Sequence, residues 1–157
     1  MPDLRERRRR ATQADLVSAA LELFIERGFE ATTVEDIAAA AGIGRRTFFR
    51  YFASKNDAVW GDFDQSLSDL RARFAAADPQ QPLLEALREA VLAFNRFDPV
   101  EVPWHRDRME LILGVPALQA HSTLRYAAWR HVVAQFVAQR LDEPVNALLP
   151  QLIAHSC

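Results

Sequence analysis

The chain has few of the residues that cross-link a fold, bind metals or anchor a protein in a membrane. Its 157 residues include one cysteine, one lysine and five glycines. A single cysteine cannot form an internal disulfide, and the four histidines have no metal-site spacing, so we expect no bound metal. No segment approaches the roughly 18 apolar residues of a membrane span, and no apolar stretch follows the basic N-terminus. We therefore predict a cytoplasmic protein with no signal peptide and no membrane partner.

Sequence signatures of catalysis are also missing. Neither a serine elbow nor a Cys-His nucleophile is visible, and Gly42-Ile43-Gly44 lacks the third glycine and the preceding strand of a phosphate loop. Asp62 and Asp64 lie two apart on an expected helix, so their carboxylates do not face each other. We predict that the chain is not an enzyme, has no catalytic residues and needs no cofactor.

Alternating runs typical of strands are absent, whereas half of the residues are hydrophobic and apolar positions recur with the helical period. This pattern predicts an all-α fold. Caps and breakers place two short helices between residues 32 and 57. They place the other helices at about 13–27, 55–76, 83–95, 104–113, 117–141 and from 144 onward.

The two short helical patterns meet at the turn Gly42-Ile43-Gly44. The first repeats apolar residues at helical spacing, which predicts one buried face. Its start has the sequence of a capping box, in which a side-chain oxygen accepts a hydrogen bond from a backbone N–H at the helix N-terminus. Two such boxes fit the sequence: Thr32 with Glu35, or Thr33 with Asp36.

The second short pattern separates an apolar side from a basic side. Phe48 and Phe52 lie one turn apart and can pack on the first helix, while a different arc carries arginines. An arginine fork can bond O6 and N7 of guanine together, which favours arginine over other polar residues at a DNA-reading position. The pattern therefore predicts a helix-turn-helix that binds double-stranded DNA. The residues of the basic arc are Arg45, Arg46, Phe49 and Arg50.

Residues from about Ala11 to Trp60 resemble the DNA-binding domain of the TetR family of bacterial transcriptional regulators. The resemblance rests on the ordered combination LFIERGFEATTVEDIAAAAGIGRRTFFRYFASKND. It implies that Arg45, Arg46 and Phe49 face base edges, and that hydroxyl groups and a lysine hold phosphates. The residues implied at phosphates are Thr33, Thr47, Tyr51 and Lys55, and Gly44 and Arg50 complete this part of the expected DNA-binding set.

Charge is divided unevenly along the chain. The net charge is −2, but residues 1–55 carry nine arginines and one lysine against eight acidic residues, which leaves −4 for residues 56–157. This asymmetry points the N-terminal part towards an anionic partner. The run Arg7–Arg10 precedes the expected first helix and is either a solvated tail or a DNA-binding arm, and the neighbouring helix-turn-helix favours the arm. In the arm interpretation, Arg9 and Arg10 reach phosphates or the minor groove.

We expect a helix-turn-helix domain with its basic arm at 1–56 and a helical effector-binding and dimerisation domain at 57–157. The segments WGDFD and LQAHSTLRYAAWR resemble the TetR subgroup associated with mycofactocin gene clusters. The resemblance implies a small apolar effector, of acyl-CoA type for this subgroup. Aromatic residues at helical spacing also have a simpler interpretation as core. The expected ligand-binding residues are Trp60, Phe63, Phe94, Trp104, Met109, Leu113, His121, Arg125, Tyr126 and Trp129.

The family resemblance further implies a repressor that acts as a homodimer on a palindromic operator and leaves it when the effector binds. Members of the family usually continue through two further helices that pair between subunits, whereas this sequence ends in an apolar segment at Cys157. We therefore expect a truncated dimer contact. The alternative function is a truncated helix-turn-helix interaction module that does not repress alone.

Overall fold

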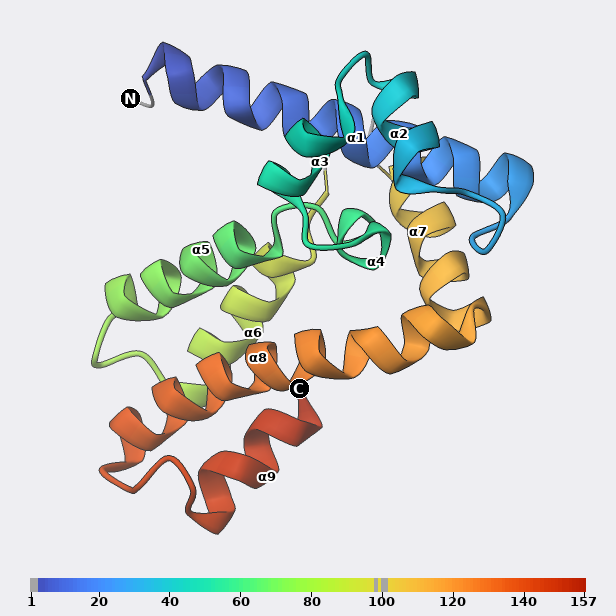
Figure 1. Cartoon of the computed structure of the whole chain (residues 1–157). Coiled ribbons are helices and arrows are strands. Elements are labelled where there is room, and N and C mark those ends of the chain that lie inside the picture. The colour runs from blue at the N-terminus through green and yellow to red at the C-terminus, as the bar shows by residue number, and fades with distance from the viewer. Residues whose placement is uncertain (1–2, 98, 100–101) are drawn as a thin grey trace. The chain divides into compact units, whose positions relative to one another are not determined.

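The computed structural model describes residues 3–97, 99 and 102–157. Within these ranges the regular secondary structure is entirely helical, with nine α-helices and no strand (Figure 1), which confirms the expected all-α fold. None of the described helices is both long and apolar enough to cross a membrane. The helices are α1 Leu4–Arg27, α2 Val34–Ala40, α3 Arg45–Tyr51, α4 Lys55–Ala58, α5 Phe63–Ala76, α6 Leu83–Phe94, α7 Val102–Gly114, α8 Pro116–Leu141 and α9 Leu148–Ser156.

The chain divides into two compact units. The first consists of Met1–Asp62 with Pro99–His121, and the second of Phe63–Asp98 with Ser122–Cys157. Helix α7 packs on α1, which is why residues far along the chain belong to the first unit. The two units do not coincide with the division at residue 56 that the sequence suggested. A functional boundary at that position stays a prediction.

The first unit is organised around one face of α1. Leu16, Ala20 and Phe24 are separated by four residues each and are at most 2% exposed, because positions i and i+4 share a helix face. Ile37 of α2 and Phe48 of α3 are fully buried in the same core. The two short helices are therefore fixed on α1 by apolar packing.

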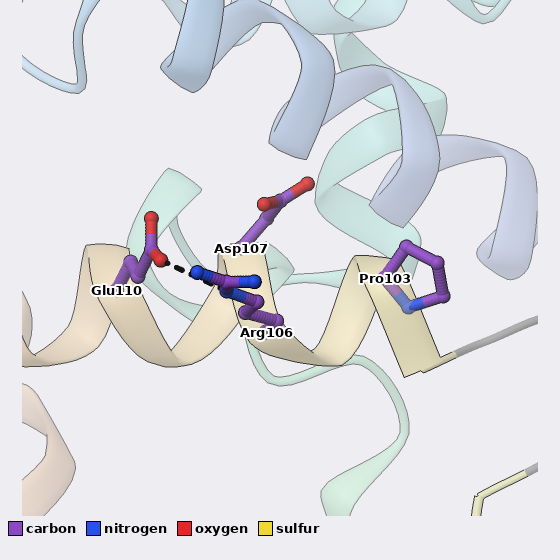
Figure 2. A pocket seen from close by; sticks show the side chains of 4 residues that line it. All are labelled: Pro103, Arg106, Asp107 and Glu110. Atoms are coloured by element: carbon purple, nitrogen blue, oxygen red, sulfur yellow. Dashed lines mark hydrogen bonds and ion pairs between the residues drawn. The ribbon is translucent and has the colours of Figure 1, made fainter.

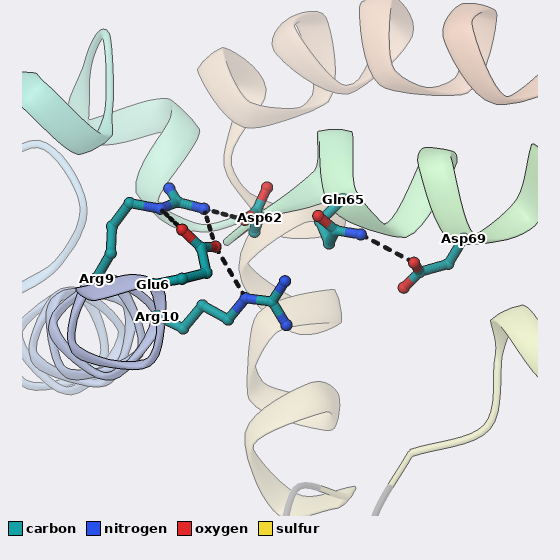
Figure 3. Close-up of polar contacts among 6 residues, drawn as sticks. All are labelled: Glu6, Arg9, Arg10, Asp62, Gln65 and Asp69. Atoms are coloured by element: carbon teal, nitrogen blue, oxygen red, sulfur yellow. Dashed lines mark hydrogen bonds and ion pairs between the residues drawn. The ribbon is translucent and has the colours of Figure 1, made fainter. Parts of the chain in front are cut away.

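Helix α1 begins at Leu4, so the expected start at Gln13 is wrong. The run Arg7–Arg10 is helical and exposed, so it is not a disordered tail. Its role as a DNA-binding arm stays a prediction. Glu6 lies 3.0 Å from Arg9 Nη2 and 3.0 Å from Arg10 Nε (Figure 3), the spacings at which helical side chains meet. Hydrogen bonds from Arg9 and Arg10 lower the pKa of Glu6 to about 2.

The helix expected at 55–76 is interrupted. Helix α4 is a single turn, and α5 starts only at Phe63. Gly61 lies between them with φ of +62°, a left-handed conformation that glycine adopts readily and that ends a helix. The last helix also starts later than expected, at Leu148 instead of Pro144.

The second unit has a core of its own. Helix α5 packs against α6, and Phe74 of α5 stacks on Phe136 of α8 with ring centroids 4.2 Å apart. Arg140, near the end of α8, donates hydrogen bonds to the carbonyl oxygens of Pro79 (3.0 Å), Gln81 (2.9 Å) and Asp78 (3.1 Å). One guanidinium thus holds the whole turn between α5 and α6.

We predict that Arg140→Met lowers the free energy of unfolding by about 1 to 3 kcal/mol, because three charge-assisted hydrogen bonds to the turn are lost. Urea unfolding followed by circular dichroism measures the change. Arg73→Met, which removes an exposed arginine from α5, is the matched control and should leave stability unchanged. Equal stabilities of the two variants would contradict the role assigned to Arg140.

Candidate nucleic-acid interface

Helix α2 starts with a reciprocal capping box. The Asp36 backbone N–H donates to Thr33 Oγ1 (3.1 Å), and the Thr33 backbone N–H donates to Asp36 Oδ2 (2.9 Å). These bonds with Thr33 lower the pKa of Asp36. Of the two boxes that the sequence allowed, the structure contains the one from Thr33. Thr32 is buried instead, and its hydroxyl donates to the Gly28 carbonyl at 2.8 Å.

A short glycine-containing turn joins α2 to α3 (Figure 1). Gly42 has φ of +71°, where a side chain would be strained, and the Ile43 N–H donates to the Ala38 carbonyl at 2.9 Å. Gly44 then serves as the N-cap of α3 and is exposed. The turn fixes the direction in which α3 leaves α2.

Helix α3 has one buried side and one exposed side. Phe48 is fully buried and Phe52 is 4% exposed, whereas Phe49 on the other side is 43% exposed. Arg45, Arg46 and Arg50 are exposed as well. The arrangement leaves three guanidinium groups and one aromatic ring accessible on one short helix, as a DNA-reading surface requires.

Arg45 is held by two neighbours. Its Nε lies 2.7 Å from Glu35 Oε1 on α2, and its Cζ lies 5.2 Å from the centre of the Phe49 ring. Phe49 in turn meets the buried Phe48 ring edge to face, with centroids 5.4 Å apart. Glu35 was expected only as a capping residue, and its pair with Arg45 was not predicted, although its position on the neighbouring helix was the available signal.

The residues expected at phosphates lie in different environments. Thr33 is exposed, and its hydroxyl accepts from the Asp36 N–H, so the hydroxyl hydrogen remains available to donate. Thr47 and Tyr51 are half-buried, and Tyr51 packs against the core of the first unit. Contact of these residues with DNA stays a prediction.

Lys55 has a structural role that the sequence did not reveal. Its ammonium donates to the carbonyl oxygens of Phe29 (2.7 Å) and Thr32 (3.0 Å), and it lies 4.3 Å from the centre of the Phe29 ring. An ammonium has three N–H donors, so these bonds leave one for any phosphate. Lys55 therefore ties the start of α4 to the loop between α1 and α2.

Arg9 and Arg10 are on the helical N-terminal part of α1. Besides Glu6, Arg9 lies 3.6 Å from Asp62 Oδ2 (Figure 3). Contact of these arginines with phosphates requires that the ion pairs open. Exposed pairs of this kind contribute little free energy, so exchange for a phosphate is feasible.

The residues expected to bind the effector belong partly to the first unit. Trp60, Trp104 and Met109 pack against its core, and Leu113 is 62% exposed. A core position is the simpler interpretation for the first three.

His121, another expected effector-binding residue, also lies in the first unit. Its Nε2 lies 3.0 Å from Asp57 Oδ1, and Asp57 Oδ2 accepts a hydrogen bond from the Ser54 hydroxyl at 2.9 Å. This pair joins the start of α8 to α4. His121 thus has a structural partner of its own.

Four of the expected effector-binding residues meet in the second unit. The Phe94 ring lies 6.3 Å from Phe63 and 6.1 Å from Trp129, both approached edge-on, and the Arg125 guanidinium lies 5.5 Å from the Phe63 ring centre. The Trp129 indole N–H is buried and has no hydrogen-bond partner among the described residues. Tyr126, by contrast, is 41% exposed. We call Phe63, Phe94, Arg125 and Trp129 the aromatic cluster.

A hollow of about 510 Å³ lies along α7 in the first unit (Figure 2). It is lined by Pro103, Arg106, Asp107 and Glu110, and Arg106 Nε lies 3.3 Å from Glu110 Oε1. None of the expected effector-binding residues lines it. Its charged lining does not fit an apolar effector.

Comparison with known proteins decides the family. Residues 16–57 match the family model of the bacterial regulatory proteins of the tetR family, and residues 81–157 match that of the MftR C-terminal domain. The mycofactocin biosynthesis transcriptional regulator MftR of Mycobacterium tuberculosis is 48% identical over 148 residues, which cover 94% of this chain and 75% of that protein. The chain belongs to the TetR family. The expected resemblance to the mycofactocin-associated subgroup is thereby confirmed.

Further relatives agree with the assignment. The transcriptional regulator TcmR of Streptomyces glaucescens is 37% identical over 146 residues, which cover 88% of this chain and 64% of TcmR. Two solved structures share the fold. The SmeT–triclosan complex has a TM-score of 0.58 and 20% identity, and the match covers 92% of this chain and 74% of SmeT. The fatty acid degradation regulator FadR from Bacillus halodurans has a TM-score of 0.59 and 15% identity, and the match covers 91% of this chain and 79% of FadR.

As a member of the TetR family, the chain is a DNA-binding transcriptional regulator and not an enzyme. The family binds DNA operators and small-molecule effectors. The expected helix-turn-helix and the helical C-terminal domain are both confirmed. Which residues contact the DNA and the effector stays a prediction.

We predict that Lys55→Met lowers the free energy of unfolding by about 1 to 3 kcal/mol in the absence of DNA, because two carbonyl oxygens lose a charged donor. Urea unfolding of the free protein measures this. Arg46→Met removes an exposed cation from α3 and is the control. A Lys55→Met protein of unchanged stability, weakened only in DNA binding, would contradict the structural role.

Proposed function

We propose that the chain is a repressor that binds a palindromic operator as a homodimer and leaves it when a small apolar effector binds. The observation that carries the proposal is the exposed arc of α3, where Arg45, Arg46 and Arg50 surround Phe49 above a buried Phe48. In this proposal, residues 1–56 read the DNA and residues 57–157 bind the effector and the second subunit.

The arc supports base reading because a guanidinium presents a planar fork of donors that matches a guanine edge in the major groove. The Phe49 ring can contact a thymine methyl group in the same groove. Thr33, Thr47 and Tyr51 supply hydroxyl groups for phosphates beside α3. In this proposal Arg45, Arg46 and Phe49 face the base edges, and Arg50 completes the DNA-binding set on the same side of α3.

Apolar residues exposed on α9 support the dimer. Leu148 is 81% exposed, Leu149 44% and Leu152 57%. Exposed apolar patches mark protein interaction sites, and a second copy of the chain would cover this one. A dimer places two reading helices in half-sites about 34 Å apart, which a monomer cannot do. The alternative, an interaction module that does not repress alone, fits a chain that remains monomeric.

The aromatic cluster supports an apolar effector. Phe63, Phe94 and Trp129 offer ring surfaces, and the indole N–H of Trp129 is a buried donor that a ligand carbonyl would satisfy. Arg125 brings a cation to the same cluster, which suits an effector with an anionic group. A long-chain acyl-CoA combines an acyl chain, a thioester carbonyl and phosphates.

Sedimentation equilibrium tests the assembly directly. The chain is measured alone and with a palindromic duplex selected from a randomised library. We expect a dimer that binds one duplex. A monomer with weak, salt-sensitive binding would favour the interaction module.

We predict that Arg45→Ala weakens binding to the selected operator by about 1 to 3 kcal/mol and abolishes the preference at one base pair of each half-site, because the bidentate contact is lost. Competition binding against every single-base variant of the operator measures this. Arg73→Ala on α5 is the control. A preference that is unchanged at all positions would remove Arg45 from the reading set.

We predict that palmitoyl-CoA releases the operator whereas coenzyme A alone does not, since the acyl chain supplies the apolar surface. In Trp129→Phe, which keeps an aromatic ring and removes the N–H, release should need about tenfold more palmitoyl-CoA, the equivalent of one hydrogen bond. Fluorescence anisotropy of labelled operator measures release. Release by coenzyme A at the same concentration, or an unchanged Trp129→Phe response, would contradict this site.

A further inference from the structure

The side chain of Arg45 is fixed from two directions. Glu35 Oε1 on α2 lies 2.7 Å from Arg45 Nε, and the Arg45 Cζ lies 5.2 Å from the Phe49 ring centre. Phe49 is itself placed by its edge-to-face contact with Phe48, which is fully buried. The buried Phe48 thus places Phe49, and Phe49 in turn helps to orient the Arg45 guanidinium.

The contact with Glu35 is an ion pair at one particular nitrogen of the guanidinium. Arginine has five N–H donors, one on Nε and four on the two terminal nitrogens. Because the Glu35 carboxylate pairs with the Nε side of the guanidinium, the two terminal nitrogens remain available as a fork. A fork of this kind matches O6 and N7 of guanine.

We propose that Glu35 is a specificity-determining positioning residue, which holds Arg45 by Nε so that its terminal nitrogens meet one guanine. The inference rests on the proposed function, in which Arg45 reads a base. A free arginine side chain samples many rotamers and loses that freedom on binding. A guanidinium that is already held in place loses less conformational entropy when it binds. A wrong base then meets two donors that cannot reorient to find other acceptors.

Stability of the fold does not explain the pair. The side chains of Arg45 and Glu35 are 65% and 60% exposed, and ion pairs that exposed contribute little to folding. A carboxylate at this place also repels phosphates and weakens binding to every DNA sequence. Glu35 thus lowers the affinity for DNA of any sequence, and the gain in base discrimination from the positioning of Arg45 offsets this loss.

The test separates the charge of Glu35 from the size of its side chain. Glu35→Gln keeps the size and removes the charge, whereas Glu35→Ala removes both. Both variants should bind random-sequence DNA more tightly than the unmodified chain. At one guanine of the selected operator, both should lose about tenfold in discrimination, because neither retains the ion pair with Arg45.

Matched controls are Glu30→Gln and Glu30→Ala, which remove an exposed charge from the loop before α2. They should not change discrimination at any base pair. Circular dichroism melting confirms that each variant folds. Discrimination equal to that of the unmodified chain, in either Glu35→Gln or Glu35→Ala, overturns the inference.

A double-mutant cycle with Arg45→Ala distinguishes the positioning role of Glu35 from the base-reading role of Arg45. In the Arg45→Ala background, Glu35→Ala should have no further effect on discrimination, because its effect acts through Arg45. A further loss there overturns the positioning role alone and leaves Arg45 as a reader. If Arg45→Ala itself keeps the full discrimination of the unmodified chain, then the base-reading proposal and this inference both fail.

Discussion

The burial of Phe48 is the contact on which the rest of the first unit depends. Its ring is fully buried in a core built on one face of α1, and the loss of such a ring typically costs about 3 to 5 kcal/mol. A helix with one residue locked in a core cannot rotate about its axis. Because α3 cannot rotate, Arg45, Arg46 and Arg50 must face outward together. The capping box at Thr33 and the carbonyl contacts of Lys55 fix the segments on either side.

Much of the fold could be predicted because apolar periodicity is local. The apolar pattern predicted the bounds of α6 and α8 to within one residue at each end. The start of α1 was missed because residues 4–12 contain few apolar residues, and their helix contains charge pairs around Glu6 that periodicity does not detect. The break at Gly61 was missed because only the structure gives its positive φ.

Parts of the candidate site could likewise be predicted from local sequence, whereas other parts depend on tertiary contacts. The basic arc of α3 follows from helical spacing alone, so the sequence was sufficient to predict that it is exposed. The partners of these residues were not predictable, because Lys55 bonds carbonyls 26 and 23 residues away and Glu35 reaches Arg45 across a turn. The expected effector-binding residues include some that pack in the core of the first unit and some in the aromatic cluster. The sequence could not separate them, because an aromatic residue at helical spacing has the same pattern in both places. Tertiary packing separates Trp104 in the first unit from Trp129 in the second.

In the proposed function, intramolecular ion pairs also affect how strongly the first unit binds DNA of any sequence. Glu6 pairs with Arg9 and Arg10, Asp36 lies 3.7 Å from Arg27, and Glu35 pairs with Arg45. An arginine that contacts DNA in this proposal must first exchange its carboxylate for a phosphate or base, so its net contribution to DNA binding is smaller than that of a free cation. Non-specific affinity rests on the number of phosphates neutralised, whereas specificity rests on base contacts. Glu6, which pairs with arginines proposed at phosphates, therefore lowers the affinity for random DNA and for the operator alike. The ratio of these affinities determines whether a regulator finds its site among the competing sequences of a genome.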